Sequence, residues 1–439
     1  MKPKPHSKES KQPRILKLPE RIEAQTEASF FAIANPGMEK LVRREIEEIL
    51  HGRELVETVG GVQFQAQIEA VYLGQARLKT VNRLLLRIDQ FGARDFQKLF
   101  RKVKGLPWQS WLKAGVGLRA RASSHASRLK IKKGIERTIL EAFAEVVKTP
   151  PKKELMILAR VEDDICTLSL DLSGELLHKR GDREDVGQAP LRETWAAGIL
   201  SRAWEIVTAD QELREKFSNP WHWIEPMAGT AVFAREALKS LDAGALTSAP
   251  GRTFAMQECL KIEGLKPVAQ TPEATSQVAS GETPWSPLKS LKRVSILDRD
   301  SKQLKLAEAG VLELRGQGRD WNLETEFQVS DFKQKALGLK AGEARFVVLN
   351  PPWGVRLKSE DAVSSFERQT RLLQDIQTQF QPTFVALVLP EISAPPGAGG
   401  GAKTLKTPPG WTAHEGFSFR AGGIPVEARF FSVGTVKTR

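Results

Sequence analysis

From Trp221 onward, short apolar runs alternate with stretches in which apolar residues recur every three or four positions. Short apolar runs predict buried strands, and helical spacing between them is typical of a doubly wound α/β sheet. Most of the runs lead directly into a helical stretch, as this fold requires. The runs lie within WHWIEPMAGTAVFAREAL, RVSILDRDSKQLKLAEA, FQVSDFKQ, RFVVLNPPWGV and TFVALVLP.

The first part of the chain has a different pattern. Residues 1–27 are polar and rich in lysine and proline, so we expect a disordered basic tail. Short strand-like runs and helical stripes then mix through residues 28–175, which predicts an α+β domain. We assign residues 176–439 to the α/β domain. Within it, residues 263–290 are rich in Pro, Ser, Thr and Gln without a period, which predicts a flexible insertion.

Positive charge is concentrated in the α+β part. The net charge is +13, and the window from Arg77 to Lys133 contains sixteen Lys and Arg residues against two acidic residues. Such an excess favours a polyanionic partner, because binding to phosphates releases counterions. A solvated basic face is the alternative. The candidate nucleic-acid contacts near the end of the window are Arg121, Arg128, Lys130, Lys132 and Lys133.

Other features of the sequence exclude several classes of protein. No apolar run is long enough for a transmembrane helix, and the basic N-terminal stretch lacks the apolar core of a secretory signal. Cys166 and Cys259, the two cysteines of the chain, match no metal or redox spacing. We therefore expect a cytoplasmic protein that has no metal site and no membrane partner. The oligomeric state cannot be predicted from these features.

The ends of the predicted strands carry candidate chemistry, because ligands of doubly wound sheets bind outside the carboxyl ends of the strands. The first strand ends in a glycine-containing turn, where the N-terminus of the next helix offers free N–H groups. An ordinary strand–helix turn is the alternative reading. The residues of this turn that we expect to bind a cofactor are Glu225, Pro226, Met227, Gly229 and Thr230.

Acidic residues end the next two strands. Asp298 is placed to accept hydrogen bonds from both ribose hydroxyls of a nucleotide-like cofactor, or else to cap the following helix. Asp300 is a second candidate for that cap. Further along, Asp331 could accept a bond from an adenine amino group, with Phe332 against the ring.

The fourth strand ends in FVVLNPPWGVRL, residues 346–357. Asn350 offers a carbonyl oxygen as acceptor, and Pro351 and Pro352 stiffen the turn and have no N–H to donate. Trp353 offers a flat face on which a base can stack. Hydrogen-bond acceptors beside a stacking face suit an exocyclic amine on a heterocycle. The lone pair of that amine becomes available when the acceptors bind its N–H groups. The alternative is a rigid turn with Trp353 in the core.

These motifs resemble those of a known family. NPPWG resembles the N/D-P-P-Y/F/W motif of amino-group methyltransferases that use S-adenosylmethionine. HKRGDREDVGQAPLRETWAAGIL, EPMAGTAVFAREAL, RTFAMQE, LDRDSKQLKLAEAG and NPPWGVRL follow in the order found in bacterial THUMP-domain RNA guanine-N2 methyltransferases. FFAIANPGMEKLVRREI, SHASRLKIKKGIERTI and FRAGGIPVEARFFSV resemble the start, the THUMP segment and the closing β-hairpin of that family.

The resemblance implies a ferredoxin-like plus THUMP RNA-binding region followed by a Rossmann-like class I methyltransferase domain. It places the cofactor loop on residues 225–231, the ribose-binding acid on Asp298, the adenine-contacting acid on Asp331 and the catalytic tetrapeptide on residues 350–353. The family usually has Asp-Pro-x-Cys-Gly-Ser-Gly in the loop, so Ala231 here replaces its second glycine. Trp353 replaces the commoner tyrosine.

The resemblance therefore implies methylation of a guanine N2 amine with S-adenosylmethionine as cofactor, and the likeness is greatest to the 23S rRNA enzymes. A tRNA guanine-N2 or adenine-N6 enzyme fits the same acceptors. A catalytically impaired RNA-binding or ribosome-assembly protein is the alternative of another class. Methylation of a protein glutamine is disfavoured by the basic region.

Overall fold

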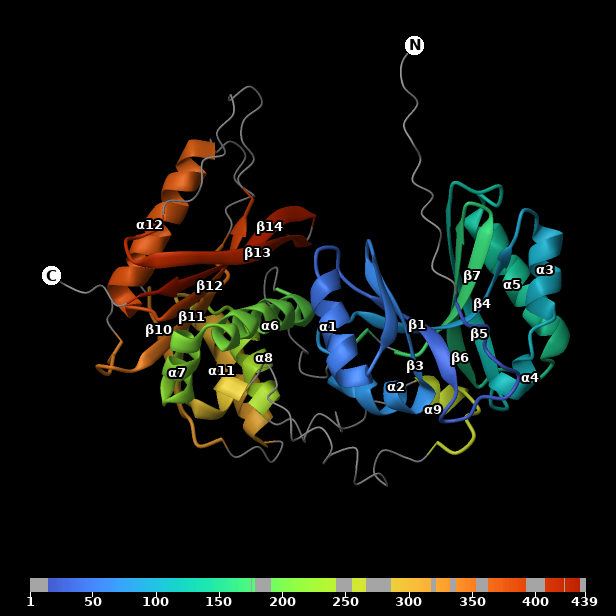
Figure 1. The fold of residues 1–439 in the computed structure, drawn as a ribbon, viewed down its shortest axis with the longest axis horizontal. Coiled ribbons are helices and arrows are strands. Elements are labelled where there is room, and N and C mark those ends of the chain that lie inside the picture. Colours follow the sequence, from blue (N-terminus) through green and yellow to red (C-terminus); the bar gives the residue numbers. More distant parts are fainter. Residues whose placement is uncertain are drawn as a thin grey trace, which may run out of the picture. The chain divides into compact units, whose positions relative to one another are not determined.

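The computed structural model describes residues 15–174, 176–177, 191–241, 255–265, 286–316, 321–331, 337–352, 362–391, 407–421 and 423–434. These residues form two units (Figure 1). Unit 1 contains residues 15–34, 42–177 and 255–265 among those described, and unit 2 contains residues 35–41 and the remainder. Each unit has its own sheet and its own hydrophobic core.

The first half of unit 1 is a four-stranded antiparallel sheet in the order β2-β3-β1-β4, as far as the described residues show. Buried residues of helix α1 recur at Val42, Ile46 and Leu50, the spacing that places apolar side chains on one helix face. The elements are β1 (Glu27–Ile33), α1 (Glu39–Leu50), β2 (Arg53–Thr58), β3 (Gly61–Gln67), α2 (Ile68–Gly74), η1 (Gln75–Arg77) and β4 (Arg83–Gly92).

The second half of unit 1 extends the same sheet. Strand β7 pairs antiparallel with β4 and with β6, while β5 pairs parallel with β6, so the described residues give one continuous order β2-β3-β1-β4-β7-β6-β5. Helices α3 and α5 pack against each other beside this sheet (Figure 1). The elements are α3 (Phe96–Lys104), α4 (Trp108–Trp111), β5 (Val116–His125), α5 (Lys132–Val146), β6 (Lys153–Glu162), β7 (Ile165–Asp171) and α9 (Ala255–Cys259).

The segment before β1 packs onto unit 1. Leu18 and Ile22 are buried in its core, and the N–H of Leu18 donates to the carbonyl oxygen of Ile88 at 3.2 Å. The prediction of a disordered tail is wrong for residues 15–27, because these apolar side chains gain enough burial to offset the entropy of ordering. Residues 1–14 lie outside the described residues.

Residues 255–265 follow α8 of unit 2 in sequence but belong to unit 1. Leu260 forms a β-bridge with Leu112, and Glu263 forms one with Glu23. Lys113 donates its backbone N–H to the carbonyl oxygen of Cys259 at 2.9 Å. The start of the predicted flexible insertion, residues 263–265, is therefore part of unit 1, because its backbone groups find partners there. Its end, residues 286–290, is a 3₁₀ helix (η4), and residues 266–285 lie outside the described residues.

Unit 2 has a mostly parallel sheet, whose order among the described residues is β10-β9-β8-β11-β12-β14-β13. The first five strands are parallel, and the β13–β14 hairpin adds antiparallel strands at one edge. The elements are α6 (Glu193–Ala209), α7 (Gln211–Ser218), β8 (Trp221–Pro226), α8 (Val232–Leu241), η4 (Ser286–Ser290), β9 (Leu291–Asp298), α11 (Ser301–Gly316), β10 (Glu324–Val329), β11 (Ala344–Leu349), α12 (Ala362–Phe380), β12 (Phe384–Pro390), β13 (Trp411–Ala421) and β14 (Ile424–Val433).

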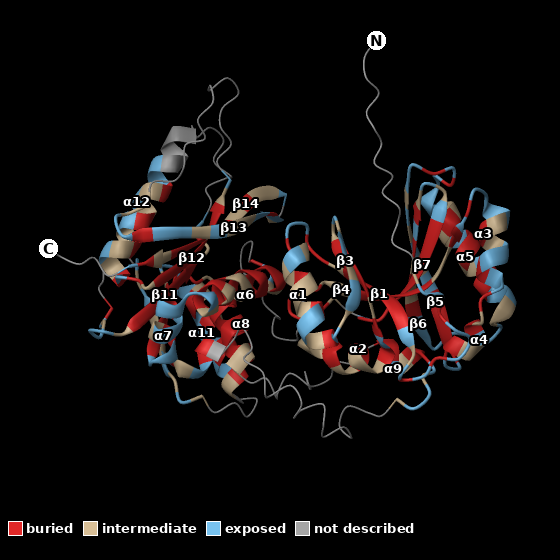
Figure 2. Cartoon of the chain, viewed as in Figure 1, coloured by how far each residue is buried: buried red, intermediate tan, exposed pale blue. Residues whose placement is uncertain are grey.

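Both faces of this sheet are buried, as Figure 2 shows for its central strands. Along β11, Phe346 and Val348 join the core that contains α6, α8 and α11, whereas Val347 and Leu349 join the core that contains α12. Alternate side chains of a strand point to opposite faces, so a strand covered on both sides needs an unbroken apolar run. This explains why the central parallel strands β8, β11 and β12 are buried along almost their whole length, whereas the edge strand β10 is not.

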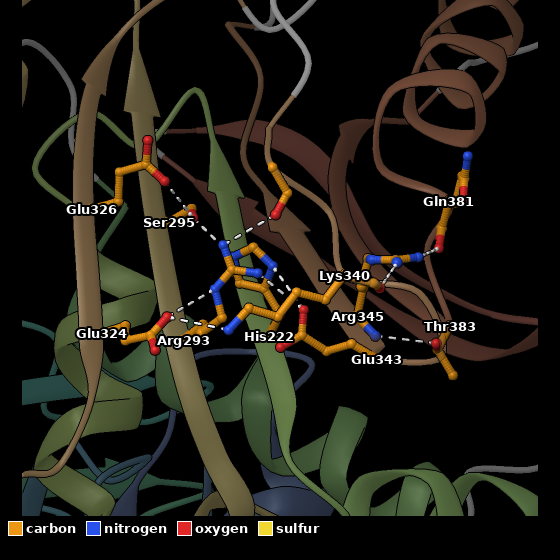
Figure 3. A network of polar contacts seen from close by, with 11 residues as sticks. His222, Arg293, Ser295, Glu324, Glu326, Lys340, Glu343, Arg345, Gln381 and Thr383 are labelled. Atoms are coloured by element: carbon orange, nitrogen blue, oxygen red, sulfur yellow. Dashed lines mark hydrogen bonds and ion pairs between the residues drawn. The ribbon is translucent and has the colours of Figure 1, made fainter.

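A buried histidine lies at the amino end of the parallel strands (Figure 3). His222 is the second residue of β8 and is fully buried. Its Nε2 atom lies 2.8 Å from Oγ of Ser295, and its Nδ1 atom lies 3.7 Å from Oε2 of Glu343. Burial lowers the pKa of His222 to about 3, and the nearby charges of Arg293 and Arg345 act in the same direction. The imidazole is therefore neutral at physiological pH.

Two arginines tie the same end of the sheet together (Figure 3). Arg293 pairs with Glu343 at 3.1 Å and with Glu324 at 3.3 Å. Arg345 donates to the backbone carbonyl oxygens of Lys340 and Gln381 at 2.6 and 3.1 Å. These bonds join β9, β10, β11 and the chain segments that precede β11 and β12.

Candidate functional site

The carboxyl ends of four neighbouring parallel strands meet at one edge of the unit 2 sheet. Pro226 is opposite Leu297 in the register, and Asp298 is opposite Val329. On the other side of β8, Ile224 is opposite Val347, so the chain after Leu349 leaves the sheet beside the loop after Pro226. The strand order reverses between β8 and β11, which makes this the switch point where such sheets bind ligands.

The loop after β8 has an unusual backbone. Met227, Gly229 and Ala231 have φ values of 61°, 54° and 52°, in the left-handed region that favours glycine. The loop is fixed by bonds from Ala228 N to Leu297 O at 2.9 Å and from Ala231 N to Ala228 O at 2.8 Å. A Cβ atom built on Gly229 would have no described heavy atom within 4 Å. The backbone of Gly229 therefore faces open space.

Glu225, the residue that begins the predicted cofactor loop, is directed into the protein. It is 1% exposed, and its Oε2 atom accepts the N–H of Ala234 in α8 at 2.7 Å. Burial raises the pKa of Glu225 to about 8, although the backbone bond to Ala234 acts in the opposite direction. This carboxyl group thus ties the end of β8 to the first turn of α8.

Asp298 connects two of the strand ends. Its Oδ2 atom accepts the N–H of Gly229 at 2.8 Å, and its Oδ1 atom accepts the N–H of Asp300 at 2.8 Å. The side chain that caps the following helix is Asp300, whose Oδ1 atom accepts the N–H of Lys302 at 2.8 Å. Because each carboxylate oxygen can accept more than one hydrogen bond, Asp298 retains acceptor capacity beside the open face of Gly229.

The predicted adenine contacts are described only in part. Asp331 is exposed and lies two residues beyond the end of β10. The N–H of Ser330 donates to the carbonyl oxygen of Asp298 at 3.0 Å, which keeps this segment beside the end of β9. Phe332 lies outside the described residues.

Asn350 follows directly after β11. Its Oδ1 atom is buried and has no hydrogen-bond partner among the described residues. Pro351 is buried and Pro352 is exposed, whereas Trp353 lies outside the described residues. A buried acceptor without a donor is costly, and native proteins keep few of them. Asn350 thus presents a carbonyl oxygen that suits an N–H donor from a ligand.

The predicted RNA contacts lie on one part of unit 1. Arg121 is exposed on β5, Arg128 and Lys130 are exposed in the loop after it, and Lys132 and Lys133 are exposed in the first turn of α5. The basic window as a whole is not one exposed face. Arg87, for example, is 7% exposed and donates to Oγ of Ser169 at 3.0 Å.

Sequence reasoning missed Arg94 and Asp164 near these contacts. Asp164 accepts the backbone N–H of Arg128 at 2.7 Å, and its Oδ2 atom lies 3.5 Å from Arg94 and 3.7 Å from Arg128. Asp163 and Asp164 both have positive φ, which acidic residues adopt more readily than most. Both residues lie in the turn between β6 and β7.

The described residues contain neither a helix that is long and apolar enough to cross a membrane nor a group of three His, Cys, Asp or Glu side chains that could hold a metal ion.

Comparisons with known proteins agree with this architecture. Residues 29–85 match the RlmL ferredoxin-like domain, and residues 93–171 match the THUMP domain. These domains correspond to the two halves of the unit 1 sheet. The predicted α+β class of this region is thereby confirmed.

Curated relatives and solved structures extend the likeness to unit 2. The ribosomal RNA large subunit methyltransferase K/L of Cellvibrio japonicus (strain Ueda107) is 28% identical over 340 residues, 75% of this chain and 42% of that protein. The chain thus spans less than half the length of this relative. A possible methylase from Clostridium difficile 630 has a TM-score of 0.66 at 21% identity and covers 94% of this chain and 100% of its own.

The structure of SMU.472 complexed with SAH has a TM-score of 0.68 at 18% identity, and the match covers 94% of this chain and 99% of that one. Identities this low show the fold alone. Together the matches confirm the predicted Rossmann-like methyltransferase fold after the ferredoxin-like and THUMP domains. The chain is therefore similar in sequence to ribosomal RNA large subunit methyltransferases K/L and similar in fold to methylases of the same architecture.

Proposed function

We propose that this chain is an S-adenosylmethionine-dependent RNA methyltransferase that acts on the exocyclic N2 amine of a guanine in 23S rRNA. The observation that carries the proposal is the buried Oδ1 atom of Asn350, which lacks a donor among the described residues. An exocyclic amine supplies the missing N–H. The similarity to large-subunit rRNA methyltransferases supports rRNA as the substrate class.

The loop after β8 and the end of β9 fit the cofactor. Gly229 faces open space, so a ligand can approach its backbone closely. Asp298 lies beside it and has acceptor capacity for the two ribose hydroxyls. Asp331 and the predicted contact Phe332 follow the next strand. When bound, S-adenosylmethionine supplies an electrophilic methyl group.

The residues after β11 act on the amine. The carbonyl oxygen of Asn350 accepts one N–H bond, which holds the nitrogen in place and favours the positive charge that develops on it. Pro351 and Pro352 have no N–H that could compete for this acceptor, and their fixed φ angles keep the turn rigid. Trp353 stacks on the base in this proposal. In this proposal the reaction depends mainly on the position of the amine, so no strong general base is needed.

Unit 1 holds the RNA through its exposed cations. In this proposal Arg121, Arg128, Lys130, Lys132 and Lys133 contact phosphates and orient the substrate. The target base leaves its stack to reach Asn350, as enzymes that modify bases require. The predicted boundary at residue 176 lies near Leu177, but residues 35–41 belong to unit 2 and residues 255–265 belong to unit 1.

Nucleoside mass spectrometry tests the reaction. Purified protein comprising residues 1–439 is incubated with S-adenosylmethionine and with unmodified 23S rRNA or tRNA, and the digested nucleosides are analysed. We expect N2-methylguanosine from 23S rRNA. N6-methyladenosine, or modification of tRNA alone, would contradict the proposed substrate. The absence of any methylated nucleoside would favour an RNA-binding or assembly protein.

Calorimetry tests the cofactor site separately. Asp298→Asn keeps an acceptor for the N–H of Gly229 but cannot accept both ribose hydroxyls as a carboxylate does. We expect it to weaken S-adenosylmethionine binding by roughly tenfold or more, since a hydrogen bond to a charged group contributes about 1.5–3 kcal/mol. Asp300→Ala, which removes only the cap of α11, serves as the control. Equal affinities for Asp298→Asn and the parent would remove Asp298 from the site.

A further inference from the structure

Helix α12 of unit 2 has a polar residue in its core-facing stripe. Leu373, Ile376 and Phe380 of this helix are buried in the core that also contains residues of β11 and β12. Gln369 precedes Leu373 by four residues, so it continues the same face of the helix, and it is 6% exposed. Glutamine is seldom buried, because its amide has donors and an acceptor that need partners. The stripe thus places an amide where it predicts an apolar side chain.

Helix α12 runs antiparallel to β11 and β12, which places Gln369 at the carboxyl ends of these strands. Its Nε2 atom donates to the carbonyl oxygen of Pro390, the last residue of β12, at 3.3 Å. Just beyond the other end of the helix, the carbonyl oxygen of Gln381 accepts from Arg345, near the start of β11, at 3.1 Å. Gln369 therefore lies at the same edge of the sheet as the candidate site.

Asn350 lies close to this position. Leu349 is opposite Leu387 in the register of the two strands, and Pro390 lies three residues beyond Leu387. With about 4.8 Å between neighbouring strands and about 3.3 Å per residue, the carbonyl group of Pro390 lies roughly 8 Å from Cα of Asn350. The amide of Gln369 is bonded to that carbonyl group. A base held at Asn350 can therefore reach Gln369.

The amide of Gln369 has an acceptor to spare. Its Oε1 atom is buried and has no hydrogen-bond partner among the described residues. The bond to Pro390 fixes the direction of the amide, because the reverse orientation would bring two oxygen atoms together. In the described part of unit 2, the buried amide oxygens without a partner are those of Gln369 and Asn350. Two such acceptors at one edge of the sheet favour a ligand that brings two N–H groups.

We propose that Gln369 determines the specificity for guanine, with its Oε1 atom accepting the N1–H of the target base while Asn350 accepts an N–H of the adjacent N2 amine. The inference rests on the proposed function for the reaction and adds the residue that selects the base. In guanine, the ring nitrogen beside the reactive amine carries a hydrogen. In adenine, the ring nitrogen beside the N6 amine is an acceptor. An acceptor at Gln369 therefore bonds to guanine and repels adenine.

Methylation of RNA that contains a base analogue tests this role. The guanosine that the parent methylates in 23S rRNA is located by mass spectrometry, and transcripts assembled by ligation carry guanosine or 2-aminopurine at that position. 2-Aminopurine keeps the exocyclic amine on the same carbon, but its N1 atom has no hydrogen. The parent alone provides a first test, because equal kcat/KM values for the two RNAs would overturn the inference.

Variants of the protein provide the second test. Gln369→Met removes the acceptor from a side chain of similar length, whereas Gln369→Glu retains an acceptor. Gln374→Met, the same change at an exposed position of the same helix, is the matched control. Thermal unfolding verifies that each variant folds.

We expect Gln369→Met to lower kcat/KM at least about tenfold for the guanosine RNA and less than about twofold for the 2-aminopurine RNA, since the lost bond needs the N1–H. Gln369→Glu and Gln374→Met should keep the preference of the parent for guanosine. Equal losses on both RNAs would indicate a structural role and overturn the inference, as would a parent-like kcat/KM of Gln369→Met on guanosine. These results leave the proposed function standing, whereas a parent that methylates no guanosine overturns both.

Discussion

The two ends of the unit 2 sheet are built on opposite principles. At the amino end, Arg293 of β9 pairs with Glu343, just before β11, and neutral His222 lies beside them (Figure 3), although the Nδ1 atom of His222 has no hydrogen-bond partner among the described residues. At the carboxyl end, the backbone is left-handed at Ala231, and Asn350 keeps a buried acceptor without a donor among the described residues. Left-handed backbone at residues with side chains costs stability, and such strain is concentrated at ligand-binding sites. The comparison teaches that one end is built for stability and the other for binding.

The largest effect is expected at Asn350. Asn350→Ala should lower the single-turnover rate of methyl transfer by about 10²–10³-fold, since the acceptor acts mainly as charge develops in the transition state. The melting temperature should stay the same or rise, because the buried acceptor is removed. Asn219→Ala, the same change at an exposed position just before β8, is the control. A parent-like rate for Asn350→Ala would refute a catalytic role.

Removing Glu343 should lower stability and leave the rate of methyl transfer unchanged, the reverse of the result expected for Asn350→Ala. Arg293 is 12% exposed at its side chain and would lose a partner at 3.1 Å while keeping Glu324. We expect Glu343→Ala to lower the free energy of unfolding by about 3 kcal/mol, measured with urea, and to leave the rate unchanged below its melting temperature. Glu324→Ala, at a side chain 71% exposed, should cost less than about 1 kcal/mol. A lower rate without lower stability would erase the contrast between the two ends.

Buried Glu225 should make stability depend on pH. Its pKa is raised from 4.5 to about 8, so the folded protein keeps a proton that the unfolded chain releases in this range. The folded state then binds more protons, and stability should fall as the pH rises from about 4.5 to about 8. Urea unfolding should show that the free energy of unfolding falls less between pH 5 and pH 8 for Glu225→Gln than for the parent. An equal fall in the free energy of unfolding for both proteins would show that Glu225 does not cause the pH dependence.

The lowered pKa of His222, about 3, has the opposite consequence. The unfolded chain gains a proton at this residue below about pH 6.5, whereas the folded protein does not. Stability from this residue is therefore lost as the pH falls from about 6.5 towards 3. The two ends of the sheet thus make stability depend on pH in opposite directions.

The smallest effect is expected at Ala231. Its φ of 52° strains a residue with a side chain by roughly 1–2 kcal/mol, so Ala231→Gly should raise the melting temperature slightly. Ala228→Gly in the same loop, where φ is not positive, should lower it. Differential scanning calorimetry of both variants is the measurement. A lower melting temperature for Ala231→Gly would show that its methyl group packs favourably enough to outweigh the strain.

Much of unit 2 could be predicted because its signals are local. The continuous apolar run of β11 and the acidic residue at the end of β9 follow from strand periodicity and from the general position of ligands in parallel sheets. The burial of Leu18 could not be predicted in this way, because it depends on a surface made by residues far along the chain. The contacts of Asp164 likewise depend on three segments that meet only after folding. Glu225 was predicted to begin the cofactor loop, whereas its inward direction depends on α8, because its side chain accepts the N–H of Ala234.

The return of residues 255–265 to unit 1 has a consequence for how the protein is made. Leu112 and Glu23 are synthesised long before Leu260 and Glu263, the residues with which they form bridges. During translation, at roughly 5–20 residues per second, the start of unit 1 must wait until β8 and α8 of unit 2 have also left the ribosome. The N-terminal unit therefore cannot complete its folding first, and a gene fragment that stops at Leu177 encodes it without its last segment.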